Sequence, residues 1–180
     1  GYPVALYLYD SDLKGGFLGT VLSFGQNGVV DDTQALYLPR AYLLSLGERV
    51  ECIYWYEFRD GGDDATYNEH RFGVVRNDLD PKPAYKAYAT LARALGQAKL
   101  VEKREVGEGS YCYVFDAGET LTAAIWRAEG EAQITIDAPG NVATVDYMGQ
   151  PAPVEMRDGT ATVTASEKVL YLTGISKAPE

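Results

Sequence analysis

The sequence predicts an α/β segment, residues 1–96, followed by an all-β domain, residues 97–180. Before residue 97, apolar runs typical of buried strands alternate with runs of helical period, in the order strand, helix, strand, helix. After residue 98 the apolar positions repeat every second residue, in short runs separated by turn residues about every ten positions. The chain of 180 residues, 46% hydrophobic and 23% charged, is long enough for two such domains.

The first half of the α/β segment predicts a strand over residues 2–9 and then a helix over residues 32–46. Asp32 is the expected N-cap of this helix, and Gly47 the residue that ends it. Pro39 lies inside the helix, where it removes one backbone hydrogen bond and clashes with the preceding turn. We therefore expect a kink or a later start.

The second half predicts a strand over residues 50–58 and a helix over residues 84–95. The strand is β-branched and aromatic with few charges, which is typical of a strand buried on both faces. The helix consists of strong helix formers, begins next to Pro83 and is followed by Gly96. The short joint after Gly96 indicates domains that pack together rather than a flexible tether.

The sequence after residue 98 predicts about eight short strands in some 80 residues. This number of strands for this length fits a small antiparallel β-sandwich. Sequences rich in Gly, Pro, Asn and Asp separate them, as turns require. The expected strands cover residues 99–105, 110–116, 120–127, 132–136, 142–148, 153–156, 160–165 and 169–173.

The charge of the chain excludes several classes of partner. Its formal net charge is −10, which disfavours nucleic acid and anionic membrane surfaces, both of which bind through many cations. No run of about 18 apolar residues is present, and no signal peptide is visible. The two cysteines, Cys52 and Cys112, fall in different predicted domains, so we expect both to be free, buried thiols.

Three stretches resemble clan-A glycoside hydrolases, enzymes whose (β/α)8 barrels often carry a C-terminal β-sandwich. Residues 34–43 are similar to the helix after the seventh barrel strand, and residues 54–61, Tyr-Trp-Tyr-Glu-Phe-Arg-Asp-Gly, to the eighth strand and its sugar-facing end. Phe72-Gly73-Val74-Val75 with Pro81-Lys82-Pro83-Ala84-Tyr85 resembles the start of the final helix. The resemblance implies a partial (β/α)8 barrel, its last two βα units, followed by a small antiparallel β-sandwich.

Trp55 is the predicted main contact to a sugar. If the segment runs parallel to the opening strand, Trp55 lies at the end where barrel enzymes build their sites, and an indole offers a flat apolar plane to a pyranose ring. Glu57 and Asp60 follow, and their carboxylates could accept hydrogen bonds from sugar hydroxyls. The alternatives are a core or rim aromatic for Trp55, and solvated charges or an ion pair with Arg59 or Arg71 for the two acids.

Hydrolysis of a glycosidic bond requires two carboxyl groups, and the chain does not provide the pair that the resemblance implies. One would lie on a fourth strand, which this sequence does not contain. The other would end the seventh strand near Leu8, yet no Glu precedes Glu48. Asp10 and Asp12 are weak substitutes, because their shorter side chains would misplace a nucleophile. The single histidine, His70, excludes a site built from several histidines and is expected to be an ordinary loop residue.

The resulting hypothesis is the C-terminal fragment of an O-glycoside hydrolase acting on polysaccharide or oligosaccharide, inactive by itself, needing no cofactor and no metal. Its expected partners are a carbohydrate and the N-terminal barrel portion, and its expected location is extracellular or periplasmic.

The alternative is a non-catalytic carbohydrate-binding or structural β-sandwich module. Such a module would expose coplanar aromatics on one sheet face, and the candidates for this are Tyr111, Tyr113, Phe115, Trp126, Tyr147 and Tyr171. Spacing gives the first three one common face, where burial is expected.

Overall fold

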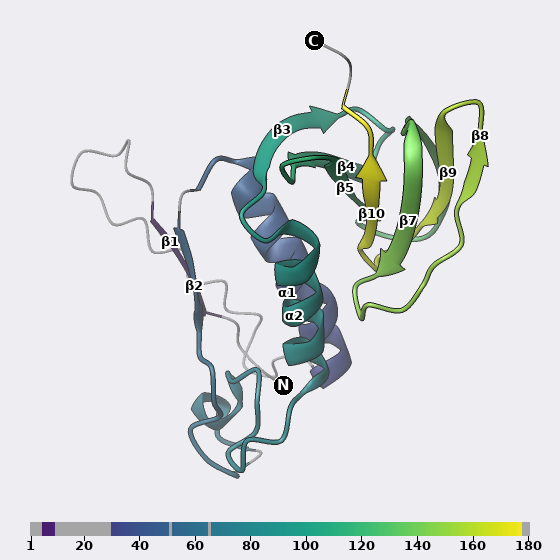
Figure 1. Cartoon of the computed structure of the whole chain (residues 1–180). Coiled ribbons are helices and arrows are strands. Elements are labelled where there is room, and N and C mark those ends of the chain that lie inside the picture. The colour runs from purple at the N-terminus through teal and green to yellow at the C-terminus, as the bar shows by residue number, and fades with distance from the viewer. Residues whose placement is uncertain (1–4, 10–29, 51, 65, 178–180) are drawn as a thin grey trace. The chain divides into compact units, whose positions relative to one another are not determined.

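A computed structural model describes residues 5–9, 30–50, 52–64 and 66–177 (Figure 1). The contacts divide the chain into two units, Gly1–Tyr88 and Ala89–Glu180. The division falls inside the second long helix, so this helix begins in the first unit and ends in the second. None of the helices in the described part of the chain is long and apolar enough to cross a membrane.

The first unit follows the predicted element order. It contains strand β1 (Ala5–Tyr9), helix α1 (Asp31–Gly47), strand β2 (Cys52–Tyr56), the 3-10 helix η1 (Asn68–Arg71) and the start of helix α2 (Pro83–Leu95). Both helices are confirmed, and their ends lie within one residue of the predicted ones.

Helix α1 differs from the prediction at its beginning. It starts at Asp31, and the N-cap is Val30, without a side-chain hydrogen bond, rather than Asp32. Asp31 and Asp32 lie in the first turn instead, where carboxylates interact favourably with the helix dipole. Pro39 lies inside the helix and does not delay its start, because buried packing of the neighbouring Leu38 and Leu43 offsets the lost hydrogen bond.

The predicted parallel pairing of the first two strands is wrong. β1 pairs with β2 antiparallel, with Leu6 opposite Trp55 and Tyr7 opposite Tyr54. Burial on both faces is also wrong for β2, since Tyr54 and Tyr56 are exposed while Ile53 and Trp55 are half-buried. The two corrections have one physical reason: parallel strands need cover on both faces, whereas an antiparallel pair tolerates one face in water.

The second unit contains two antiparallel sheets, as predicted for the all-β domain. One has the order β3-β4-β5-β10-β7 and the other β6-β9-β8 (Figure 1). Residues 89–177 contain eight strands, and eight were expected. They are β3 (Lys99–Arg104), β4 (Ser110–Asp116), β5 (Leu121–Arg127), β6 (Ala132–Asp137), β7 (Gly140–Asp146), β8 (Glu155–Arg157), β9 (Thr160–Ala165) and β10 (Leu170–Ile175).

A single apolar core joins the two sheets. Every second residue of β4, β5 and β10 contributes to it from the larger sheet, and β6 and β9 contribute from the smaller one. Among its members are Val114, Ile125, Ile134, Val163 and Leu172, each at most 3% exposed. Burial alternates along β6 and β9, as predicted, whereas the middle residues of β4 and β5 are buried on both faces. The shared core confirms two packed sheets.

Candidate functional site

The segment that follows β2 folds back on itself through backbone hydrogen bonds. The amides of Val74 and Val75 donate to the carbonyl oxygen of Phe58, each at 3.0 Å, and the amide of Asp60 donates to the carbonyl oxygen of Val75 at 2.9 Å. Lys82 then donates its amide to the carbonyl oxygen of Val74 at 3.1 Å. Residues 57–64 and 66–82 thus belong to a hydrogen-bonded loop that ends at the first turn of α2.

A buried ion pair holds the centre of this loop. Lys82 Nζ lies 2.6 Å from Asp60 Oδ1, and the two side chains are 0% and 1% exposed. The same oxygen accepts the amide of Gly73 at 2.9 Å. Burial lowers the pKa of the Lys82 ammonium, while the hydrogen bond and charge of Asp60 oppose that shift. The pair links two residues of the loop that are 22 positions apart in the sequence.

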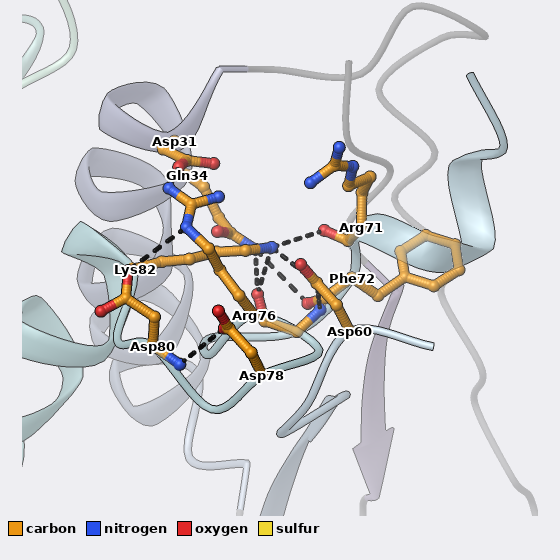
Figure 2. A network of polar contacts seen from close by, with 10 residues as sticks. Asp31, Gln34, Asp60, Arg71, Phe72, Arg76, Asp78, Asp80 and Lys82 are labelled. Atoms are coloured by element: carbon orange, nitrogen blue, oxygen red, sulfur yellow. Dashed lines mark hydrogen bonds and ion pairs between the residues drawn. The ribbon is translucent and has the colours of Figure 1, made fainter. Parts of the chain in front are cut away.

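Backbone carbonyls complete the surroundings of Lys82. Its ammonium also donates to the carbonyl oxygens of Gly73, at 2.9 Å, and Arg71, at 3.2 Å (Figure 2). Gln34 of α1 donates from Nε2 to the carbonyl oxygen of Gly73 at 3.2 Å. A side chain at position 73 has no room, because a Cβ there would lie 2.3 Å from the amide nitrogen of Asp60. All three ammonium protons are used, so this lysine serves the architecture of the loop.

A second ion pair ties the loop to the beginning of α1. Arg76 lies 2.6 Å from Asp31 Oδ2 and 3.6 Å from Asp80 Oδ2. The Asp31 side chain is 21% exposed and that of Arg76 38%, so water screens this contact more than the pair at the loop centre. Figure 2 shows the residues of both ion pairs in one network of polar contacts.

Trp55 packs against helix α1. Its indole is half-buried and stacked on the Tyr42 ring, with centroids 6.4 Å apart and planes 24° apart. Tyr42 in turn lies 5.2 Å from the ring of Tyr88 in α2, and burial together with the Tyr88 hydroxyl raises the pKa of Tyr42. Trp55 thus occupies the position of a rim aromatic under the helices, which was the alternative to a sugar contact. Its contact with a sugar stays a prediction.

The other predicted contacts have different surroundings. Glu57 is half-buried, and its carbonyl oxygen accepts the amide of Val74 at 3.2 Å. Asp60 is paired with Lys82 rather than with Arg59 or Arg71, and its Oδ2 is buried with no hydrogen-bond partner within the described ranges. The roles of Glu57 and Asp60 toward a sugar stay predictions.

Sequence reasoning missed a set of exposed aromatics on and beyond β2. Tyr54 is 65% exposed and Tyr56 48%, and both lie on the face of the strand opposite to Trp55. Phe58, two positions further, is 62% exposed. Because the whole run is apolar, its composition carries no period from which the exposed face could be predicted.

Asp10 and Asp12, the predicted substitutes for a nucleophile, stay predictions. Asp10 and Asp12 lie outside the described residues, and Leu8 takes the register position opposite Ile53 in the β1–β2 pair. His70 belongs to η1, and its imidazole packs edge-on against Tyr67 with centroids 4.8 Å apart. It also fills the space in which a Cβ at Gly62 would lie, so its position is that of a packed loop residue.

Cys52 and Cys112 are the two cysteines of the chain. Both thiols are free; Cys112 is buried as expected, whereas Cys52 is only half-buried. Burial raises the pKa of the Cys112 thiol to about 11. Within residues 5–9, 30–50, 52–64 and 66–177, no three His, Cys, Asp or Glu side chains come together to hold a metal ion.

The aromatic residues of the second unit do not form an exposed platform. Tyr113, Phe115, Trp126 and Tyr171 are at most 6% exposed. Tyr111 is half-buried and stacks on Trp126, with centroids 4.8 Å apart. The alternative of a binding module with coplanar exposed aromatics on this sheet therefore loses its main candidates, and the expected burial of this strand face is confirmed for Tyr113 and Phe115.

Comparison with solved structures confirms the resemblance to glycoside hydrolases. A family 39 glycoside hydrolase from the gut symbiont Bacteroides cellulosilyticus WH2 matches with a TM-score of 0.71 and 30% sequence identity, over 84% of this chain and 32% of the other. A GH30 endoxylanase from Clostridium papyrosolvens C71 matches over 58% of this chain and 31% of the endoxylanase chain, with a TM-score of 0.50 and 8% sequence identity. The catalytic domain of xylanase C from Talaromyces cellulolyticus, also GH30, matches over 62% of this chain and 28% of the xylanase chain, with a TM-score of 0.50 and 13% sequence identity.

The chain therefore resembles one part of such enzymes and spans about a third of the length of these solved chains. The two GH30 likenesses show the fold alone. No protein-family model and no curated protein match the sequence. Since the parallel strand pair is absent, the carbohydrate interpretation depends on the family 39 likeness and not on strand direction.

Proposed function

We propose that the chain is the C-terminal part of an O-glycoside hydrolase acting on polysaccharide or oligosaccharide, and that it binds carbohydrate without hydrolysing it. The observation that carries the proposal is the likeness to the family 39 enzyme, at 30% identity over 84% of this chain but only 32% of the enzyme. In this proposal residues 1–96 are the end of a (β/α)8 barrel and residues 97–180 the β-sandwich after it.

The distribution of acidic side chains supports the absence of independent catalysis. A glycosidase needs two carboxyl groups, about 5–5.5 Å apart for retention or about 6.5–9.5 Å for inversion. In the loop after β2, Asp60 is paired with Lys82, and Asp64 accepts hydrogen bonds from the amide and hydroxyl of Thr66. These carboxylates stabilise the loop, so the catalytic pair would come from the N-terminal barrel portion, which we propose as the partner.

The experiment compares binding and turnover by residues 1–180. We expect soluble neutral glycans, such as xylo- and cello-oligosaccharides, to bind by isothermal titration calorimetry, with no release of reducing ends above the buffer rate. Hydrolysis that disappears in an Asp10→Asn or Asp12→Asn variant would show that the chain carries its own catalytic group. Failure to bind any glycan in the series would contradict the carbohydrate assignment.

We also propose an extracellular or periplasmic location, because polysaccharides are too large to enter the cytoplasm. Fractionation of the source cells, followed by detection with an antibody to residues 97–180, tests this location. A signal confined to the cytoplasmic fraction would contradict it.

A further inference from the structure

We infer that the buried polar cluster between helix α1 and the loop after β2 holds at least one internal water molecule. The polar cluster, as the term is used here, consists of Asp31, Gln34, Asp60 and Lys82. The water donates hydrogen bonds to the two most deeply buried acceptors of the cluster, Gln34 Oε1 and Asp60 Oδ2. The inference goes beyond the proposed function and does not depend on it, because all four residues belong to the first unit.

Three buried oxygen atoms of the polar cluster have no hydrogen-bond partner among the described residues. They are Asp31 Oδ1, Gln34 Oε1 and Asp60 Oδ2. Gln34 is 0% exposed, and the Asp60 side chain 1%. Each such oxygen gives up its hydrogen bonds to bulk water when the chain folds, and native folds almost always provide a donor in return. The polar cluster therefore requires a source of donors.

The acceptors are gathered around one stretch of backbone. Gln34 donates from Nε2 to the carbonyl oxygen of Gly73 at 3.2 Å, and Asp60 Oδ1 accepts the amide of Gly73 at 2.9 Å. Both side chains are thus fixed beside the ammonium of Lys82 (Figure 2). Asp31 and Gln34 are three positions apart on α1 and so are neighbours on one face of the helix. The unpartnered oxygens therefore belong to one network.

Neither the nearest cation nor a partner chain can provide the donor. The three ammonium protons of Lys82 go to Asp60 Oδ1 and to the carbonyl oxygens of Gly73 and Arg71. The unpartnered oxygens themselves expose almost no surface. A side chain of the N-terminal barrel portion is bulkier than a water molecule, so it cannot reach an atom that surface water does not touch. The donor is therefore enclosed within the first unit.

Charge selects water rather than an ion. Each carboxylate of the polar cluster already has a cation, since Asp60 pairs with Lys82 and Asp31 with Arg76, each at 2.6 Å. A metal cation would add positive charge beside a buried ammonium, and an anion such as chloride has no proton to donate. Water is neutral and donates two hydrogen bonds. Internal waters typically make about three hydrogen bonds to buried polar groups, which matches a cluster of several acceptors.

A crystal structure of residues 1–180 at about 1.5 Å resolution tests the inference directly. We expect an ordered water oxygen within about 2.6–3.2 Å of Gln34 Oε1, of Asp60 Oδ2 or of both. Electron density that shows no water at either atom would overturn the inference. A protein donor bonded to both atoms would overturn it as well.

Counting internal waters in solution tests the same inference with a matched pair of variants. Oxygen-17 magnetic relaxation dispersion counts the water molecules that a protein holds for longer than it takes to tumble. Gln34→Met removes the buried acceptor and is expected to lower this count by at least one. Gln133→Met is the control, because Gln133 is exposed on β6 and donates to Thr164 at 2.9 Å. It is expected to leave the count unchanged.

The outcomes of this experiment are separate from those of the glycan experiment. Equal counts in Gln34→Met and in the unaltered chain would overturn the inference, and so would an equal loss in both variants. Should Gln34→Met fail to fold, the crystal structure of the unaltered chain still decides the question. Neither measurement uses a sugar, so failure to bind any glycan would contradict the proposed function and leave the internal water in place.

Discussion

Replacing Lys82 by Met tests whether the buried ion pair holds the loop after β2. The substitution keeps the length of the side chain and removes the charge. It leaves the Asp60 carboxylate, whose side chain is 1% exposed, with the amide of Gly73 as its partner at Oδ1. It also removes the donor from the carbonyl oxygens of Arg71 and Gly73. We expect the free energy of unfolding of the first unit to fall by about 3–5 kcal/mol, the usual cost of an unpaired buried charge.

A matched control separates burial from charge. Lys177 and Asp116 form an ion pair of similar length, 2.8 Å, but both side chains are 40% exposed. Lys177→Met therefore has a far smaller expected effect, because water screens the pair and solvates the carboxylate that remains. The two substitutions remove the same group, so a difference between them measures what burial adds.

Urea unfolding with a local probe provides the measurement. Hydrogen exchange by mass spectrometry reports the first unit separately, through peptides that contain the amide of Gly73, which is bonded to Asp60. The double variant Asp60→Leu with Lys82→Met is expected to recover part of the lost stability, because it leaves no unpaired charge. A loss in Lys82→Met no larger than in Lys177→Met would refute the reasoning.

Three further predictions concern other parts of the chain. Gly73→Ala is expected to destabilise the first unit by about 1–3 kcal/mol, measured by urea unfolding, since a Cβ would lie within 2.6 Å of three backbone atoms. Cys52 is expected to react with a thiol reagent well before Cys112, whose pKa is raised to about 11 by burial, in a timed labelling experiment at pH 8. The Lys177 hydrogen bond lowers the pKa of Asp116 below 3.8, so the pair stabilises the fold above that pH and loses its effect as the pH falls through the lowered value. The difference in stability between the wild type and Lys177→Met should thus vanish on acidification, and equal stabilities at pH 7 would contradict it.

The β-domain could be predicted from sequence because its signals are local. Strands such as β6 and β9 alternate apolar and polar residues over six positions, and turn residues separate them. Thr160–Ala165 was predicted with its observed ends for this reason, and Ser110–Asp116 because turn residues bound its apolar run on both sides. The helices likewise follow from residues that start or stop them, such as Pro83 and Gly96.

The candidate site could be predicted only in part, because its contacts are not local. Asp60 and Lys82 are 22 positions apart, and a lysine between two prolines gives no sign that it is buried. The motif around Trp55 located the strand, but it gave no sign that the indole packs on α1 while Tyr54 and Tyr56 are exposed. In a run of aromatic residues, the exposed face depends on which side the helices cover, and that is a property of the packing.

The arrangement around β2 joins a buried ion pair to an exposed ring in one short segment. The carboxylate of Asp60 holds Lys82 and the amide of Gly73, and the loop so fixed carries Phe72 against the ring of Tyr56. Loss of the ion pair should therefore also loosen the packing of Phe72 on the Tyr56 ring. In a double-mutant cycle of unfolding free energies, Lys82→Met should destabilise a Tyr56→Ala chain less than the wild type, because the ring that the loop supports is gone. Additive effects would show that the loop and the Tyr56 ring act independently.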